Sequence, residues 1–245
     1  MSVIDEFKQE CNDRVESYKT DAAFQSVANA FVETSITRKY SYNFSWLGRP
    51  IIQYPQDIVM MQEIIWDVKP DLIIETGIAH GGSIIFYASM LELLRNNGQV
   101  IGIDIDIREY NRAEIEKHPM FKRITMIEES SIDEKVIESL QLIANNKKKV
   151  LVCLDSNHTH DHVLRELELY APFVSVGSYC VVFDTLIEDM SSVCTSSDRP
   201  WTKGNNPKTA VNEYLKTNNS FEIDRNIESK LLITAAPGGY LRRIK

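Results

Sequence analysis

Residues 71–83 read Asp-Leu-Ile-Ile-Glu-Thr-Gly-Ile-Ala-His-Gly-Gly-Ser, a short apolar run followed by a turn that contains three glycines. The apolar run predicts a buried β-strand over residues 71–75, and a helix is expected to follow over residues 83–95. A strand, a glycine turn and a helix in this order bring a nucleotide close to backbone N–H groups. The G-x-x-x-G-G spacing differs from the G-x-G-x-x-G of dinucleotide-binding enzymes and lacks the lysine of a P-loop. The turn therefore favours a nucleotide-type cofactor and argues against NAD and against ATP hydrolysis.

Short apolar runs alternate with amphipathic stretches along the rest of the chain. Strands are predicted over residues 71–75, 100–103, 124–127, 150–154 and 179–183, and helices over residues 55–68, 83–95, 108–117, 132–145, 161–170 and 207–216. This alternation indicates an α/β fold with a mostly parallel central sheet and helices on both faces. Later apolar runs at residues 221–223, 231–234 and 240–241 predict an antiparallel hairpin at one edge of the sheet.

The first 54 residues are predicted to form an N-terminal extension to a cofactor-binding domain over residues 55–245. Residues 3–34 are amphipathic and contain no glycine or proline, which predicts helical structure, whereas residues 35–54 are irregular or hairpin-like and rich in aromatics. The aromatic side chains either pack against the core or form a lid or a contact between subunits. Their number favours a homo-oligomer.

The composition limits the kinds of partner. The 245-residue chain is 43% hydrophobic and 25% charged, as in ordinary globular proteins, and its formal net charge is -8. An acidic chain repels the phosphates of nucleic acids and of anionic membranes, so neither is expected as a partner. The four cysteines form no C-x-x-C pair, and the N-terminus has no apolar core of a signal peptide. A cytoplasmic protein without structural zinc or disulfides is expected.

Acidic and hydroxyl side chains at the ends of the first three strands predict how the cofactor binds. Glu75 would repel a pyrophosphate but suits the cationic methionine part of S-adenosylmethionine. Asp104, at the end of the second strand, is expected to accept hydrogen bonds from the ribose hydroxyls, and Asp106 could instead cap the next helix. Ser130 and Ser131 are expected near the adenine, although Ser131 could also be a helix N-cap. The residues predicted to surround the cofactor are Glu75, Thr76, Gly77, His80, Gly81, Gly82, Ser83, Asp104, Ser130, Ser131 and Asp155.

The fourth and fifth strands end in residues that are suited to catalysis. Asp155 and Asp184 follow these strands, and ligands of open α/β sheets bind beyond the carboxyl ends of the strands. Two carboxylates suit a hard cation such as Mg²⁺, which could hold a substrate hydroxyl and lower its pKa. His158 lies three residues after Asp155, where a neutral imidazole could take the proton of that hydroxyl.

Two other classes of function remain open. His158, His160 and His162 beside Asp155 also fit the two-histidine, one-carboxylate triad of non-haem iron hydroxylases. That triad is usually built on a β-barrel, and no long antiparallel pattern is present. His160 and His162 are expected to be solvated or to cap the next helix. The third class is a cofactor-binding protein without catalysis.

The combined motifs resemble the cephalosporin hydroxylase/rhamnosyl O-methyltransferase family over nearly the whole chain. The matching segments are Trp46–Gln53, Ile74–Ser83, Ile101–Asp106, Leu154–His158 and Pro237–Leu241. The resemblance implies a Rossmann-like methyltransferase fold, S-adenosylmethionine and a divalent cation. By position, it assigns Gly77 and the pair Gly81–Gly82 to the cofactor, Asp104 to the ribose, Asp155 and Asp184 to the metal, and His158 to the general base.

The chain departs from this pattern at one position. Similar metal-dependent members have an acidic pair at the end of the fifth strand, and here the first member is Phe183. The metal site is therefore weakened, absent or completed by another group such as Glu188. The predicted activity is S-adenosylmethionine-dependent O-methylation of a hydroxyl on a sugar or a sugar-containing metabolite.

Overall fold

The computed structural model describes residues 2–191 and 199–245. The main sheet contains the strands β3 (Leu72–Thr76), β4 (Gln99–Asp104), β5 (Ile124–Glu128), β6 (Val150–Leu154), β7 (Tyr179–Val182), β8 (Phe221–Ile223) and β9 (Tyr240–Arg243). Their order is β5-β4-β3-β6-β7-β9-β8. The first five strands in that order are parallel, and β9 is antiparallel to both β7 and β8. The predicted parallel sheet with an antiparallel edge is confirmed.

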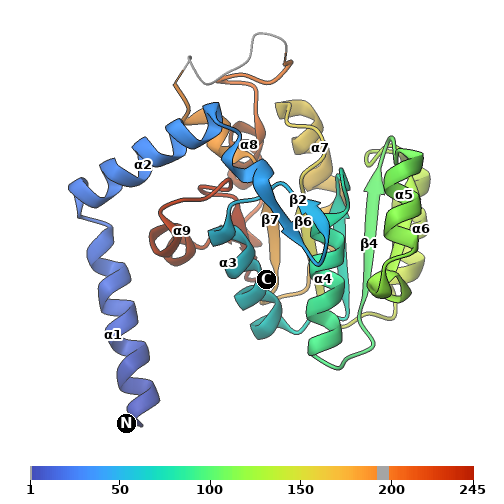
Figure 1. The fold of residues 1–245 in the computed structure, drawn as a ribbon, viewed down its shortest axis with the longest axis horizontal. Helices are drawn as coiled ribbons and strands as arrows, with labels where there is room; N and C mark the ends of the chain where they lie inside the picture. Colours follow the sequence, from blue (N-terminus) through green and yellow to red (C-terminus); the bar gives the residue numbers. More distant parts are fainter. Residues whose placement is uncertain (1, 192–198) are drawn as a thin grey trace.

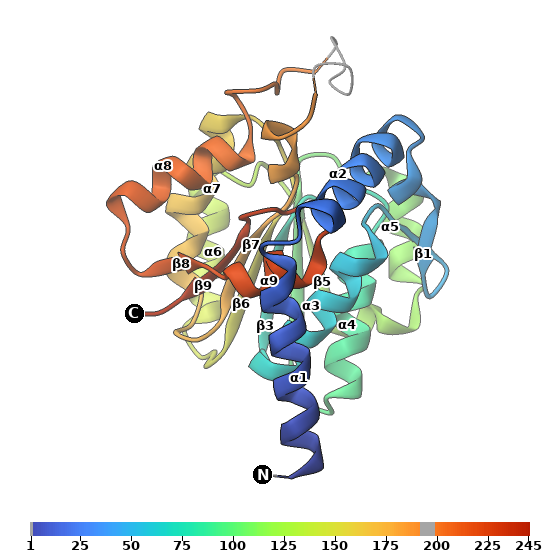
Figure 2. The ribbon, with the colours of Figure 1, turned by 90° about the vertical axis from the view of Figure 1, so that its left-hand side faces the viewer.

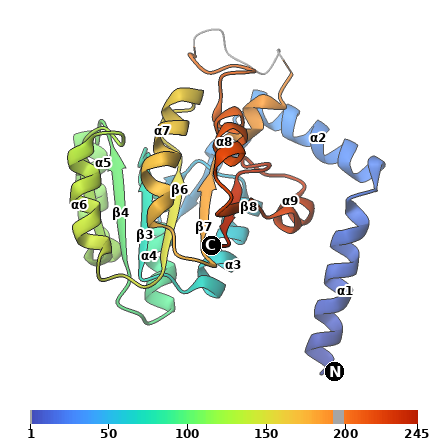
Figure 3. The same cartoon turned by 180° about the vertical axis from the view of Figure 1, so that it is seen from behind.

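Helices cover both faces of this sheet, which gives three layers (Figures 1 and 3). One face carries α3 (Pro55–Val68), α4 (Gly82–Leu93) and α5 (Glu109–Glu116), and the other carries α6 (Glu134–Ala144), α7 (His160–Tyr170) and α8 (Pro207–Thr217). Successive side chains of a strand point to opposite faces. Leu151 and Cys153 of β6 accordingly pack with α3 and α4, whereas Val150 and Val152 pack with α6 and α7. Both faces of the central strands are buried, as their continuous apolar runs predict.

The N-terminal segment forms two helices, which face the viewer in Figure 2. α1 (Val3–Tyr18) and α2 (Ala22–Thr37) are separated by Asp21, whose side chain accepts a hydrogen bond from the Phe24 N–H at 2.9 Å and caps α2. The predicted helical structure of residues 3–34 is confirmed, but the break before Ala22 was not predicted because this capping signal was missed. No residue of α1 is buried, and Figures 1 and 3 show this helix standing beside the sheet layers.

The segment after α2 forms a short 3₁₀ turn, η1 (Tyr40–Asn43), and a hairpin of β1 (Phe44–Trp46) and β2 (Arg49–Ile51). The hairpin packs on α4. Trp46 donates its indole N–H to the Ser89 hydroxyl at 2.9 Å and lies edge-to-face on Phe86 with a 4.8 Å separation of ring centroids. Part of the aromatic segment therefore packs on the core, which was the first of the two predicted alternatives.

The C-terminal region corrects one predicted strand. Residues 231–234 are not extended, because α9 (Arg225–Leu231) ends there and Leu232 adopts a left-handed backbone (φ 57°). Asp57, fully buried in α3, accepts hydrogen bonds from the Thr234 hydroxyl and from the Ala235 N–H, which holds this turn in the core. The edge hairpin consists of β8 and β9 instead.

Three further 3₁₀ turns occur in the described part of the chain: η2 (Pro119–Arg123), η3 (Ala171–Phe173) and η4 (Thr185–Glu188). Among residues 2–191 and 199–245, no helix combines the length and the apolar character that a membrane span requires.

Candidate functional site

A cavity of about 620 Å³ opens at the carboxyl ends of the parallel strands. Its wall combines residues from the ends of β3, β4, β6 and β7 with residues from the N-terminal segment and from the loop after η4. The polar lining residues include Lys39, Gln53, Asp104, Ser130, Ser131, Asp155, Asn157, His158, His162, Asp184 and Arg199. The size is within the range of small-molecule sites, and this end of an open α/β sheet is where such sites lie.

The glycine turn after β3 is held by both neighbouring strands. The Gly77 N–H donates to the Ile103 carbonyl oxygen at 2.7 Å, and the Asp155 N–H donates to the Thr76 carbonyl oxygen at 2.9 Å. Gly77 has φ +88°, and a Cβ placed there would lie 2.1 Å from the Asp155 carbonyl oxygen. A glycine is therefore required where the turn passes over the end of β6.

Asp104 stabilises the same turn from β4. One carboxylate oxygen, Oδ2, accepts the N–H groups of Ile78 and Ala79 at 2.8 and 3.2 Å, and Oδ1 accepts the Asp106 N–H at 3.2 Å. The side chain also lines the cavity, so its carboxylate can accept further hydrogen bonds from a ligand there. Asp106 does not cap α5, because Arg108 occupies the N-cap position.

Ser130 and Ser131 line the cavity, as their predicted place near the adenine requires. Ser131 is not a helix cap, because Asp133 caps α6 by accepting the Lys135 N–H at 2.8 Å. The Ser131 hydroxyl instead lies 3.0 Å from Nε2 of His162.

Several residues that were predicted to touch the cofactor lie behind the cavity wall. Glu75 and Thr76 are completely buried in β3. A Cβ on Gly81 would meet the side chain of Ile115, and a Cβ on Gly82 would lie 2.1 Å from the Pro50 carbonyl oxygen. These two glycines thus allow α5 and the hairpin to pack closely on the start of α4.

His80 and Ser83, also predicted to touch the cofactor, have other contacts. The His80 carbonyl oxygen accepts two hydrogen bonds from Arg49, at 3.0 and 2.6 Å. The Ser83 hydroxyl donates to Oε2 of Glu75 at 2.6 Å. Both residues therefore make contacts that stabilise the turn.

Burial raises the pKa of Glu75 to about 8, against the opposing effect of the hydrogen bond from Ser83. Between pH 4.5, the ordinary pKa of a glutamate side chain, and about pH 8, Glu75 keeps its proton in the folded protein but has lost it in the unfolded chain. The free energy of unfolding therefore falls as the pH rises through this window and stays at the lower level above it.

We expect the Glu75→Gln variant to lose this pH dependence. Relative to the wild type, its free energy of unfolding should increase by roughly 3–5 kcal/mol between pH 4.5 and pH 8, at about 1.4 kcal/mol per pH unit. Urea unfolding of the unliganded protein at several pH values measures the difference. Glu138→Gln, at an exposed position of α6, is the control and should leave the slope unchanged. Parallel curves for the wild type and Glu75→Gln would contradict the expectation.

Asp155, His158 and Asp184 meet at the ends of β6 and β7. Each offers one ligand atom, and these atoms lie within 4.8 Å of one another. His158 Nδ1 is 3.2 Å from Oδ2 of Asp184, and the imidazole lies edge-to-face on Trp201 at 4.7 Å. Asp184 has a left-handed backbone (φ 55°), a conformation that aspartate tolerates better than most residues. The three side chains come together in the cavity because β6 and β7 are adjacent and parallel.

The other two histidines of the cluster point elsewhere. His160 Nδ1 lies 2.8 Å from the Thr209 hydroxyl on α8. His162 Nε2 lies 3.0 Å from the Ser131 hydroxyl and 3.5 Å from the buried Glu166 carboxylate, and its side chain lines the cavity. The two residues had been expected to be solvated or to cap the next helix. In the structure, both side chains are instead hydrogen-bonded within the fold. The structure therefore groups one histidine with two carboxylates, which does not match the triad of the hydroxylase alternative.

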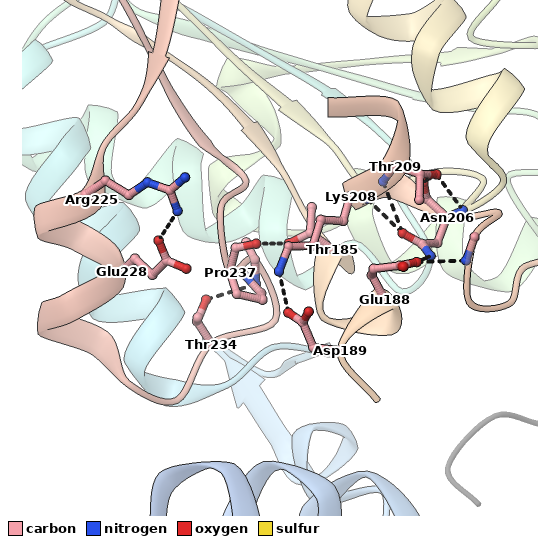
Figure 4. A network of polar contacts seen from close by, with 12 residues as sticks. Thr185, Glu188, Asp189, Asn206, Lys208, Thr209, Arg225, Glu228, Thr234 and Pro237 are labelled. Carbon is pink, nitrogen blue, oxygen red and sulfur yellow. Dashed lines mark hydrogen bonds and ion pairs between the residues drawn. The ribbon is translucent and has the colours of Figure 1, made fainter. Parts of the chain in front are cut away.

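Glu188 does not complete a metal site with Asp155 and Asp184. Its carboxylate accepts the Gly204 N–H at 2.8 Å and the side-chain amide of Asn206, as Figure 4 shows. These contacts fasten η4 to the start of α8. Phe183 is buried and lines the cavity, but its side chain has no oxygen atom that could bind a cation.

The two carboxylates that remain fit a divalent cation. The surrounding protein atoms, together with the nearby carboxylates of Asp184 and Glu75, raise the pKa of Asp155 well above its ordinary value. A cation between Asp155 and Asp184 would offset this repulsion. Mg²⁺ in proteins is commonly held by one or two carboxylates, with water and substrate oxygens as its other ligands. The donor set thus suits Mg²⁺ without the missing acidic residue.

The N-terminal segment contributes a wall of the cavity that the sequence indicated only in part. Its lining residues are Ile36, Lys39, Ser41, Tyr42, Ile52, Gln53 and Tyr54. Of the aromatic side chains in this segment, Trp46 packs on the core and Tyr42 lines the cavity. A lid or a contact between subunits stays a prediction. Gln53 was not singled out for a role, although it ends one of the motifs quoted for the family resemblance. The predicted homo-oligomer and the boundary at residue 54 stay predictions.

Comparison with known proteins agrees with this architecture. Rhamnosyl O-methyltransferase of Mycobacterium tuberculosis is 30% identical over 190 residues, which are 76% of this chain and 73% of that protein. The enzyme of the same name from Mycobacterium leprae is 27% identical over 201 residues, or 81% of this chain and 82% of that protein. Among solved structures, CmcI with Mg and SAM has a TM-score of 0.60 at 18% identity and covers 83% of this chain and 78% of its own.

A putative O-methyltransferase from Klebsiella pneumoniae has a TM-score of 0.53 at 12% identity, with 89% of this chain and 90% of its own covered. At these identities the structural likeness concerns the fold, and it confirms the Rossmann-like methyltransferase architecture. The family model described as rhamnosyl O-methyltransferase/CmcI matches residues 38–244, which include every strand of the main sheet. The chain belongs to the rhamnosyl O-methyltransferase/CmcI family.

Proposed function

We propose that the protein is an S-adenosylmethionine-dependent O-methyltransferase that acts on a hydroxyl group of a sugar or a sugar-containing small molecule. The observation that carries the proposal is the meeting of Asp155, His158 and Asp184 in the cavity beside the glycine turn. Proton-accepting groups would thus lie next to the expected cofactor position. Family membership, and relatives named rhamnosyl O-methyltransferase, support this type of acceptor.

The side chains of the site can activate a hydroxyl group. S-adenosylmethionine supplies a methyl group that is carried by its sulfonium sulfur. The hydroxyl oxygen bonds to the methyl carbon as the methyl–sulfur bond breaks, and S-adenosylhomocysteine is the leaving group. When Nδ1–H of His158 donates to Asp184, Nε2 is left with a lone pair and can take the hydroxyl proton. Asp184 orients the ring and stabilises the imidazolium that forms. Most of the acceleration comes from holding the oxygen in line with the methyl group.

Asp155 and the second oxygen of Asp184 are the proposed ligands of a divalent cation. A cation there would hold the acceptor oxygen and lower the pKa of its hydroxyl. Since Phe183 contributes no carboxylate, we expect weak binding of Mg²⁺. His158 then remains the group that receives the proton.

For the nucleoside part of the cofactor, Asp104 is the proposed partner of the ribose hydroxyls. Ser130 and Ser131 are the proposed partners of the adenine. All three line the cavity along the ends of β4 and β5. Gly77 allows close approach of the ligand to the turn. For Glu75, Thr76, His80, Gly81, Gly82 and Ser83 we propose a supporting role instead of direct contact, in line with their positions behind the wall.

Calorimetric titration of the wild-type protein with S-adenosylmethionine, with and without Mg²⁺, tests the proposal. We expect one cofactor per chain and an effect of Mg²⁺ that requires millimolar concentrations, because two carboxylates alone hold the ion. The Asp184→Asn variant should retain cofactor binding and lose the effect of Mg²⁺. Asp189→Asn, at an exposed residue that pairs with Lys208, is the matched control and should behave as the wild type.

Two outcomes would count against the proposal. A protein that binds no S-adenosylmethionine under either condition would contradict the assigned function. An Mg²⁺ effect that persists unchanged in Asp184→Asn would place the cation elsewhere and contradict the assigned ligands.

A further inference from the structure

We propose that Gln53 binds the amino-acid end of S-adenosylmethionine through its side-chain amide. The inference rests on the proposed function and extends it to a residue outside the methyltransferase sheet. Gln53 lies between β2 and α3, and its side chain lines the cavity.

The first observation is an uncompensated amide at the cavity wall. Gln53 is only 3% exposed, and within the described part of the chain neither Oε1 nor Nε2 has a hydrogen-bond partner. Buried side-chain polar atoms are hydrogen-bonded in the large majority of cases, and an exception calls for an explanation. A ligand that offers both an acceptor and a donor would satisfy this amide.

The second observation is the rigid placement of the segment that carries Gln53. The preceding strand β2 passes directly over the start of α4, where a Cβ on Gly82 would lie 2.1 Å from the Pro50 carbonyl oxygen and 2.7 Å from Cβ of Ile51. Arg49 ties the same strand to the His80 carbonyl oxygen. On the other side, the Tyr54 hydroxyl is hydrogen-bonded to Ser35 at 2.6 Å. Gln53 is therefore held next to the glycine turn, on the α4 side of the sheet.

The geometry of the sulfonium explains which part of the cofactor reaches this wall. The sulfur carries three substituents, namely the adenosyl group, the methyl group and the aminobutyrate chain. The proposed nucleoside contacts, Asp104 and Ser130, lie at the ends of β4 and β5, and the acceptor groups Asp155 and His158 lie after β6. The third substituent must therefore point in a third direction from the sulfur. The segment that carries Gln53 forms the cavity wall on the α4 side of the turn.

The chemistry of this third substituent matches the amide. Its carboxylate accepts hydrogen bonds and its ammonium group donates them, so one primary amide can serve both. A neutral amide also avoids the desolvation cost of a further buried charge in a cavity that is already lined by Asp104, Asp155 and Asp184. The amide would thus add specificity for the amino-acid end without adding charge to an acidic site.

Two ligands that differ only at this end test the inference. S-adenosylhomocysteine carries the amino-acid chain on its sulfur, whereas 5′-methylthioadenosine has a methyl group in its place. We expect Gln53→Met, a substitution of similar length, to weaken S-adenosylhomocysteine binding roughly 10- to 100-fold, as for the loss of hydrogen bonds to charged groups. Its dissociation constant for 5′-methylthioadenosine should stay within about twofold of the wild-type value, the size of a change without a lost hydrogen bond.

Control measurements separate binding from folding. Gln56→Met carries the same substitution three residues further along, in α3 and outside the cavity lining, and should bind both ligands as the wild type does. Because Gln53→Met removes two unpaired buried polar atoms, its unliganded form should melt at or above the wild-type temperature.

A selective loss of S-adenosylhomocysteine affinity supports the inference. Equal losses for both ligands, or no loss for either, would overturn it. So would unchanged affinity for both ligands together with a raised KM for the acceptor, which would assign Gln53 to the other substrate. A wild-type protein that binds neither ligand would overturn the proposed function itself, and this inference with it.

Discussion

Replacing His158 with alanine is expected to lower kcat for methyl transfer by roughly 10²- to 10⁴-fold, the usual contribution of a positioned general base. The affinity for S-adenosylmethionine should change little, because the side chain faces Asp184 and Trp201 at the acceptor end of the cavity. Single-turnover kinetics with saturating cofactor, together with calorimetric titration, would separate the two effects. A larger loss at high pH than at low pH would be inconsistent with a base, since hydroxide can partly replace one at high pH.

His160→Ala is the matched control for this prediction. His160 lies two residues further on, but its ring is hydrogen-bonded to Thr209 and does not line the cavity. Its loss should cost some stability at the start of α7 and leave kcat within a few-fold of the wild type. Activity of His158→Ala within about threefold of the wild type, far below the usual effect of a general base, would show that the hydroxyl is activated by another group.

Replacing Gly77 with alanine is expected to destabilise the fold by at least about 3 kcal/mol and to abolish cofactor binding. Two separate costs add at this position. The backbone has φ +88°, and the new Cβ would lie 2.1 Å from the carbonyl oxygen of Asp155. The clash is with backbone at the end of β6, which cannot move without displacing the Asp155 carboxylate. Urea unfolding and titration with S-adenosylmethionine measure the two consequences.

Gly177→Ala separates strain from collision. Gly177 has a similar φ of +83°, but nothing lies within 4 Å of the position of its Cβ. This variant should be destabilised only by the strain of an alanine in a left-handed conformation, about 1–2 kcal/mol, and should keep its affinity for the cofactor. If the two variants were equally destabilised and both bound the cofactor, close packing of the turn on Asp155 would not be the reason for glycine at residue 77.

Local patterns predicted the elements of the fold well where they were long or strongly marked. Helix α3 begins at Pro55 and ends at Val68, as its apolar periodicity and the following Lys69-Pro70 indicated. The parallel strands were recognisable because strands buried on both faces read as continuous apolar runs. The predicted strand at residues 231–234 was wrong because the same apolar composition also suits the end of a helix, and the cap at Asp224 was missed.

The candidate site was predictable to the extent that it lies at strand ends. Asp155 and Asp184 follow parallel strands, so their convergence could be inferred from the topology alone. The separate directions of His158, His160 and His162 could not, because they depend on which partner each ring finds on another element. His158 pairs with Asp184, His160 with Thr209 on α8, and His162 with Ser131 after β5.

By itself, the sequence determined the α/β architecture, the glycine turn and the presence of acidic residues at its strand ends, because these depend on periodicity and on residues that are close in the chain. Only the tertiary structure decided which of those residues face the cavity. Gly82 allows close contact with the hairpin, and Glu75 is buried beneath the turn. Gln53, from the N-terminal segment, lines the cavity. The physical reason is that exposure to a cavity is a property of packing between distant segments, whose contacts no local pattern of residues records.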